Sequence, residues 1–252
     1  MQIVGYEPAP VGDDSARLAV AEDGAVEWVS LAPGTQLSYG LGERHCAGTI
    51  EEGRHHACDE PTTPYCEHHT SRWPCARCTG GCTLPLASCR EEHAVYMAAF
   101  APAIFKVGVT RSWRLQTRLQ EQGADRAAHL RTVENGRKAR RIEAGIAARD
   151  NLTDRVRTTR KYQGLDRGVD TAAWDQTLAE FNPVTTHAFE YGLELNRQPV
   201  TETVAAGTVR GTKGRVLVLA RAGSMYATDL RALVGHEVGA DHGRLQASFD
   251  AF

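Results

Sequence analysis

All seven cysteines of this 252-residue chain lie in one short segment, between Cys46 and Cys89. The first residues, MQIVGYEPAPVGDD, have neither the basic start nor the apolar run of a secretory signal. We therefore expect a cytoplasmic protein, in which disulfides are rare and metal ligation is the better interpretation of clustered cysteines. The segment has few hydrophobic residues of its own, so it needs metal to hold a fold.

The cysteine spacing predicts two structural zinc sites with four ligands each. Seven cysteines leave one ligand to a histidine, for which we choose His69 in the Cys66-Glu-His-His69 knuckle. His68, His55 and His56 are alternatives, and a single zinc with spare buried cysteines is the simpler arrangement. The predicted ligands are Cys75, Cys78, Cys82 and Cys89 for one site, and Cys46, Cys58, Cys66 and His69 for the other.

The charge of the chain is uneven. The whole chain carries −2, but residues 106–161 hold 15 Lys and Arg against 6 Asp and Glu, a local +9 that leaves −11 elsewhere. A basic block inside an acidic chain is typical of a surface that binds a polyanion, although a solvated helical face is the simpler interpretation. We expect DNA or RNA as the partner. The candidate contacts are Lys106, Arg111, Arg114, Arg137, Lys138, Arg141, Arg155, Arg157, Arg160 and Lys161.

The stretch from Ala94 to Ala147 has the strongest pattern of secondary structure. It predicts a strand ending at Phe100, a turn at Pro102 and a second strand over 104–110. A helix over 113–122 with Ser112 as its N-cap follows, then a strand over 127–133 and a second helix to about 149. The longest apolar run, over 94–105, is too short to span a bilayer, so we expect no membrane partner.

Glu143 is the unusual residue of the second helix. Ala139, Ile142, Ile146 and Ala147 surround it at helical spacing, so a carboxylate lies in the middle of an apolar face. Such a placement is costly unless the charge has a partner or a function.

The order β-β-α-β-α, with Tyr96 in the first strand, Gly108 in the second, Arg118 on the first helix and Glu143 on the second, resembles the GIY-YIG nuclease superfamily. The resemblance implies that Glu143 holds Mg or Mn, Arg118 contacts the scissile phosphate and Tyr96 positions or activates the water. Arg114 is the alternative to Arg118. The motifs differ from the superfamily pattern, because AVYM lacks the leading Gly-Ile and Lys106 replaces the second Tyr.

A wider resemblance covers residues 44–238. The cysteine-rich segment, HAVYMAAFAP, FKVGVTR, TRLQEQGAD, ARRIEAGI and the late GTVRGTKGRVLVL together resemble the domain-of-unknown-function family 2797. This resemblance implies a zinc-containing protein with a GIY-YIG-like core and brings no established activity.

The flanking segments are β-rich, and the predicted fold class is α+β. We expect a β segment over 1–44, a zinc-binding module over 45–93, the GIY-YIG-like core over 94–165, and a helix with a C-terminal β domain over 166–252. The two terminal β segments can pair into one small barrel-like domain.

The predicted function is that of a zinc-stabilised nucleic-acid-binding protein, with divalent-metal-dependent phosphodiester cleavage at the GIY-YIG-like core. The alternative is a non-catalytic DNA- or RNA-binding module that uses the same Arg-rich surface. A core that binds a small phosphate-bearing ligand or a protein is a third possibility.

Overall fold

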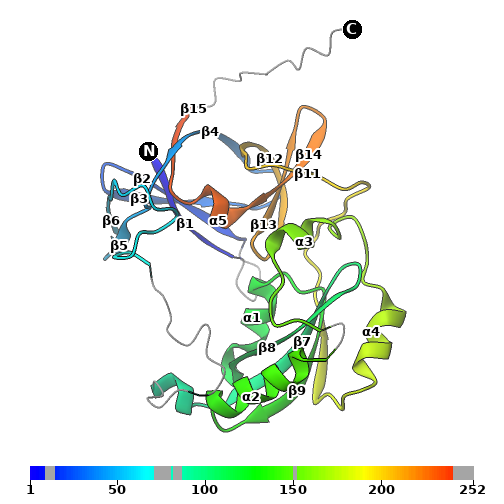
Figure 1. Cartoon of the computed structure of the whole chain (residues 1–252). Coiled ribbons are helices and arrows are strands. Elements are labelled where there is room, and N and C mark those ends of the chain that lie inside the picture. Colours follow the sequence, from blue (N-terminus) through cyan, green and yellow to red (C-terminus); the bar gives the residue numbers. More distant parts are fainter. Residues whose placement is uncertain (9–14, 71–80, 82–86, 150–151, 241–252) are drawn as a thin grey trace.

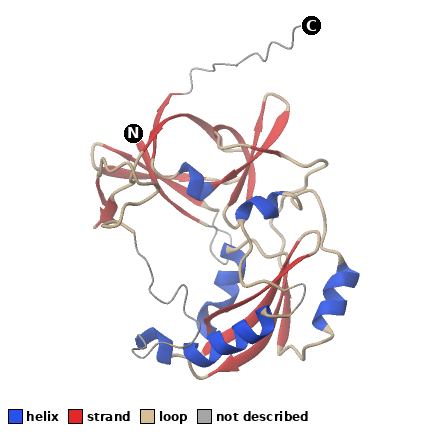
Figure 2. Cartoon of the chain, in the orientation of Figure 1, coloured by secondary structure: helices blue, strands red, loops and turns tan. Residues whose placement is uncertain are grey.

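The computed structural model describes residues 1–8, 15–70, 81, 87–149 and 152–240. These residues form a sheet-rich α+β fold with two sheets, one of eleven strands and one of four (Figure 1). The helices are few and short. Most gather around the four-stranded sheet and at its junction with the larger one, whereas α5 (Leu230–Leu233) packs against the larger sheet (Figure 2).

The four-stranded sheet has β7 (His93–Phe100) at its centre. β7 and β8 (Ile104–Arg111) form an antiparallel hairpin through the predicted Pro102 turn, with Tyr96 directly opposite Gly108. β9 (Arg126–Val133) pairs with the other side of β7, and β10 (Thr185–Ala188) pairs with β9.

Helices cover both faces of this sheet, which explains why all eight residues of β7 are buried. Side chains of a strand alternate between faces. Val95 and Met97 therefore pack toward α2 (Gly136–Ala147) and α4 (Thr171–Leu178), whereas Tyr96 packs toward α1 (Leu115–Glu121). The predicted order of elements over this stretch is confirmed.

The predicted N-cap at Ser112 is wrong. A short 3-10 helix occupies Ser112–Arg114, and α1 begins only at Leu115. The extended backbone expected of an N-cap belongs to Arg111, one residue earlier. The Ser112 hydroxyl is consequently buried without a hydrogen-bond partner among the described residues.

The eleven-stranded sheet takes strands from both ends of the chain. Its strands are β1 (Gln2–Glu7), β2 (Arg17–Glu22), β3 (Ala25–Ser30), β4 (Gln36–Arg44), β5 (Thr49–Glu51), β6 (Arg54–His56), β11 (Val200–Thr201), β12 (Ala205–Lys213), β13 (Val216–Arg221), β14 (Ser224–Asp229) and β15 (His236–Ala240). β4 lies between β12 and β15, and β1 lies between β15 and β2, so the predicted pairing of the two terminal segments is confirmed.

The described strands do not close into the predicted barrel. The order runs from β11 at one end to β5 at the other, and these end strands do not pair with each other. Both end strands are only two or three residues long, too short to provide a closing ladder. The sheet is strongly curved around its own core of Ile3, Leu18, Leu217 and Leu230, the last from α5 (Leu230–Leu233) (Figure 1).

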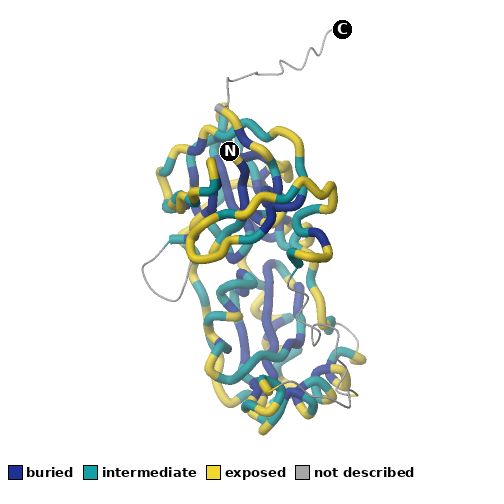
Figure 3. Tube along the Cα trace, turned by 90° about the vertical axis from the view of Figure 1, so that its left-hand side faces the viewer, coloured by how far each residue is buried: buried dark blue, intermediate teal, exposed yellow. Residues whose placement is uncertain are grey.

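The two sheets keep separate buried cores and meet at a junction (Figure 3). α3 (Thr158–Tyr162) lies at this junction, where Tyr162 and Leu165 pack against Val216 and Val218 of β13. Lys213 of β12 also reaches Asp125 of the smaller unit at 2.6 Å. None of the described helices is long and apolar enough to cross a membrane.

Candidate metal centre and basic cleft

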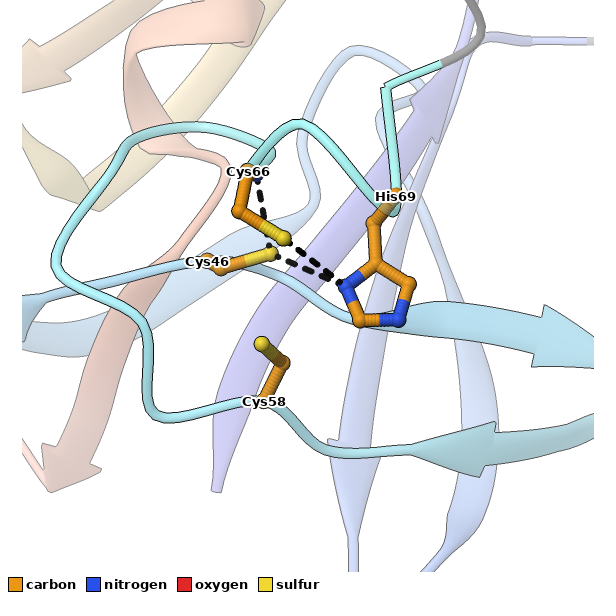
Figure 4. Close-up of side chains that lie close together, drawn as sticks. All are labelled: Cys46, Cys58, Cys66 and His69. Atoms are coloured by element: carbon orange, nitrogen blue, oxygen red, sulfur yellow. Dashed lines mark hydrogen bonds between the residues drawn. The ribbon is translucent and has the colours of Figure 1, made fainter.

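Four residues predicted as one ligand set lie together beside the larger sheet. The ligand atoms of Cys46, Cys58, Cys66 and His69 all lie within 4.8 Å of one another, and the side chains point toward a common centre (Figure 4). His69 Nδ1 is 3.4 Å from Cys46 Sγ and 3.3 Å from Cys66 Sγ. A tetrahedral ion with Zn–S bonds of about 2.3 Å holds its sulfur ligands about 3.8 Å apart. The cluster is close enough to hold a metal ion, and its donor set is compatible with structural zinc.

The local backbone brings the four ligands together. Cys46 follows β4, Cys58 follows the β5–β6 hairpin, and Cys66 begins a turn in which the backbone N–H of His69 donates to the Cys66 carbonyl at 3.2 Å. Burial disfavours the thiolate of Cys66, but backbone N–H groups of His69 and His68 donate to it, and the net effect lowers its pKa. A thiolate is the form that binds a cation.

The second predicted ligand set can be followed only at Cys89, because Cys75, Cys78 and Cys82 lie outside the described residues. Cys89 belongs to a short 3-10 helix, Ala87–Arg90, beside the start of α2. A Cβ placed on Gly136 would lie 3.2 Å from Cys89 Sγ and 3.0 Å from His93 Nε2, so both side chains meet over this glycine. His93 Nδ1 is engaged by the Glu91 carbonyl at 2.8 Å.

A cleft of about 1010 Å³ lies between the four-stranded unit and the larger sheet. Its walls come from β7, β8, α1, α2, residues 154–161 and the start of β13. Nine Lys and Arg side chains line the cleft against three carboxylates, a formal excess of six positive charges. The basic ones are Lys106, Arg111, Arg114, Arg118, Arg140, Arg155, Arg157, Lys161 and Arg215, and the acidic ones are Glu121, Glu143 and Asp154.

The four residues singled out from the β-β-α-β-α pattern all line this cleft: Tyr96, Gly108, Arg118 and Glu143. The Tyr96 ring crosses the backbone of Gly108, where a Cβ would lie 2.5 Å from its hydroxyl oxygen. Gln122 Nε2 donates a hydrogen bond to that hydroxyl at 2.8 Å. Gly108 thus lets the buried ring lie across β8 with its hydroxyl at the cleft.

The two charged members of this group are engaged by neighbours. Glu143 is only 7% exposed, and its Oε2 accepts a hydrogen bond from Arg140 Nη1 at 2.7 Å. Arg140, one turn earlier on α2, therefore balances the carboxylate on the apolar helix face. Arg118 and Arg114 both pair with Glu121, at 3.2 and 2.8 Å, so the geometry leaves both as candidates for the phosphate contact.

The structure divides the predicted nucleic-acid contacts into two groups. Six of the ten line the cleft: Lys106, Arg111, Arg114, Arg155, Arg157 and Lys161. Four do not: Arg137, Lys138, Arg141 and Arg160. Lys138 forms an ion pair with Glu134, and Arg160 lines a second cavity of about 830 Å³ beside Ile104 and Phe105.

Sequence reasoning missed several residues at or beside the cleft. Gln122, Arg140 and Arg215 line it, and their positions depend on packing between elements distant in the sequence. Trp113 lies beside it with 70% of its surface exposed, and the guanidinium of Arg111 lies 4.8 Å from the ring centroid. The run Arg-Ser-Trp-Arg, an aromatic between arginines in the basic block, was a signal that could have identified Trp113.

One family model matches residues 42–238, and its description is "Protein of unknown function (DUF2797)". No curated protein and no solved structure matches the chain.

Proposed function

The chain belongs to the DUF2797 family of proteins of unknown function, and we propose that it binds nucleic acid in the basic cleft. The observation that carries this proposal is the excess of six positive charges in the cleft of a chain whose net charge is −2. A phosphate backbone is a regular array of negative charges, and neutralising it with Lys and Arg releases bound counterions. The nine basic side chains, which come from β8, residues 114–118, α2, residues 155–161 and Arg215, offer contacts for more than one phosphate.

Trp113 favours nucleic acid over a polyanion without bases. An exposed indole between Arg111 and Arg114 offers a flat surface on which a base can stack. Stacking on an aromatic side chain contributes about 1–3 kcal/mol per base in proteins that bind single strands.

Binding is tested with hydroxyl-terminated DNA and RNA oligonucleotides over a range of salt concentrations. We expect Arg155→Ser with Arg157→Ser to weaken binding and to reduce the slope of log K against log salt, since two phosphate contacts are lost. Trp113→Ala should weaken binding with little change in that slope. Arg210→Ser, an exposed change on β12 outside the cleft, is the matched control. Wild-type protein that binds neither DNA nor RNA would refute the proposal.

A second candidate function is metal-dependent cleavage of a phosphodiester in the same cleft. The observation that favours it is that Tyr96, Gly108, Arg118 and Glu143, the residues that a GIY-YIG-like core would use, all line this cleft. In this proposal Arg118 or Arg114 contacts the scissile phosphate and Tyr96 orients the water. A carboxylate with waters is an ordinary ligand set for Mg²⁺ or Mn²⁺, which supply Lewis-acid stabilisation of charge. Arg140 pairs with Oε2 of Glu143, so a metal ion would bind at the other oxygen, Oε1, or take the place of Arg140.

Glu143→Gln separates the two functions. With Mg²⁺ or Mn²⁺ and a mixed panel of nucleic acids, we expect cleavage to fall at least a hundredfold while binding persists. Glu134→Gln is the matched control, because Glu134 is an exposed carboxylate two residues before α2 and outside the cleft. A wild-type protein that binds but cleaves nothing on the panel would leave the binding function alone.

Zinc is the proposed occupant of the Cys46, Cys58, Cys66 and His69 cluster. Three thiolates and one imidazole are a common ligand set of structural zinc sites. Elemental analysis of the purified protein tests this directly, and Cys58→Ser should remove one zinc equivalent. A second equivalent that survives this substitution would support the other predicted ligand set, which contains Cys89.

A further inference from the structure

We propose that Tyr96, Lys106 and Lys161, gathered around Gln122, form a subsite for one phosphodiester group of the bound nucleic acid. The inference rests on the proposed binding function and assigns a specific anion position within the cleft. All four residues line the cleft: Tyr96 lies on β7, Lys106 on β8 and Lys161 on α3, and Gln122 directly follows α1.

Gln122 is the centre of the arrangement. Its side-chain Nε2 donates to the Tyr96 hydroxyl at 2.8 Å, and its Oε1 accepts from Lys106 Nζ at 3.0 Å. Its backbone carbonyl accepts from Lys161 Nζ. Because the Tyr96 hydroxyl accepts a hydrogen bond from Gln122, its own proton remains available to donate to a ligand. Two ammonium groups and one hydroxyl are therefore fixed around a single residue.

The part of the chain that the structure describes gives the two lysines no counterion. Among the described residues, neither Lys106 nor Lys161 has a carboxylate oxygen within 4.0 Å, whereas Lys213 pairs with Asp125 and Arg215 pairs with Asp229. Both lysines are half-buried, and Lys161 Nζ lies 4.1 Å from the centroid of the Phe100 ring. Cations held away from water without a counterion are costly, and a bound phosphate would offset that cost.

The ionisation of Lys161 gives the subsite a measurable signature. Burial, followed by the positive charges of Lys106, Arg215, Arg118 and Lys213, lowers the pKa of Lys161 to about 7. An anion placed beside it favours the charged form, so the pKa rises when ligand is bound. Affinity is then fully present below pH 7 and falls above it, by up to about tenfold per pH unit, until the pKa of the bound state is passed.

Other ionisable groups face the same cleft. His93 of β7 and the carboxylates Glu121, Glu143 and Asp154 line it with Lys161. A ligand with only phosphodiesters does not itself gain or lose protons near neutral pH. Substitution of Lys161 therefore distinguishes its protonation from that of His93.

The test is calorimetric titration of a hydroxyl-terminated 12-nucleotide strand at pH 7.5, in two buffers of different ionisation enthalpy. Wild-type protein should take up about half a proton or more per ligand bound. Lys161→Met should take up none and bind at least tenfold more weakly. Lys161→Arg, which is always charged, should keep most of the affinity without proton uptake. Arg210→Met is the matched control outside the cleft, and thermal melting of each variant verifies folding.

The outcomes separate the subsite from the binding function. Two results would refute the subsite and leave binding in the cleft standing. In the first, the strand binds with an affinity that falls as salt rises, but without proton uptake. In the second, Lys161→Met and Lys106→Met bind the strand as tightly as Arg210→Met. If wild-type protein binds no strand, the binding function fails and the subsite falls with it.

Discussion

Gly108 is the residue on which the position of Tyr96 depends. A Cβ at this position would lie 2.5 Å from the hydroxyl oxygen and 2.6 Å from Cζ of a ring that is almost completely buried. We expect Gly108→Ala to displace the ring, to cost about 1–3 kcal/mol of stability by overpacking, and to weaken oligonucleotide binding. Thermal melting and a binding titration measure the two effects.

Gly145 provides the matched control for this substitution. It lies on α2, and a Cβ there meets nothing within 4 Å. Gly145→Ala should therefore stabilise the protein, by up to about 1 kcal/mol from helix propensity, and leave binding unchanged. A Gly108→Ala protein that melts and binds like wild type would contradict the assigned packing of Tyr96.

The chemistry of single residues was only partly predictable. Glu143 was recognisable because a charge interrupts the apolar stripe of a helix, and the structure places it at the cleft. Its partner Arg140 was three residues away but was one of several arginines at helical spacing, so the sequence pattern could not select it. Gln122 had no signal at all, because its importance comes from contacts with β7, β8 and α3.

At the scale of elements, α2 is held at its first turn by Asn135. The Asn135 side chain accepts a hydrogen bond from the backbone N–H of Lys138 at 2.9 Å, which satisfies one donor of the helix N-terminus. We expect Asn135→Ala to cost about 1 kcal/mol and to speed amide exchange in the first turns of α2. Hydrogen exchange with mass spectrometry reports this locally.

Asn135→Asp is the control, because aspartate is as good an N-cap and also favours the helix dipole. It should retain the protection of α2. Equal exchange in Asn135→Ala and wild type would show that packing of Ala139 and Ile146 alone holds the helix.

Local pattern was sufficient for some elements and insufficient for others. The hairpin, α1, β9 and α2 are contiguous, and each follows a clear hydrophobic period, so their order could be predicted. The run Gly211-Thr212-Lys213-Gly214 is typical of a turn, yet β12 continues to Lys213 and only Gly214 belongs to the turn. Gly211 lies instead at a break in strand register, with φ of +150°, and a glycine in a bulge resembles a glycine in a turn.

At the scale of the whole molecule, the proposed zinc site joins the end of β4 to the segment over 45–70, which contributes β5 and β6 to the larger sheet. Gln2 of β1 donates to the Cys46 carbonyl at 3.3 Å, and His45 Nδ1 is 2.8 Å from the Cys58 carbonyl. Metal binding contributes folding free energy where little hydrophobic core exists. We expect strong chelation to raise amide exchange across residues 45–70 and neighbouring β1, while β7 and β9 stay protected.

Cys58→Ser should give the same exchange pattern without chelator, which ties the effect to this cluster. Exchange that is unchanged by both treatments would show that the segment over 45–70 folds without metal.

The pairing of the two terminal β segments was predicted only in outline. β4 pairs with β12 and β15, which lie more than 150 residues away, and the alternation of residues along a strand does not say which strand it pairs with.

The order of strands in the larger sheet also sets an order of events during synthesis. β4 lies between β12 and β15, both of which leave the ribosome long after it, whereas the unit from β7 to α2 emerges in between. The nascent chain must therefore carry β4 with both edges open while the smaller unit folds. The four residues of the proposed zinc site, from Cys46 to His69, are translated early, so zinc bound there would fix the end of β4 before its partners exist.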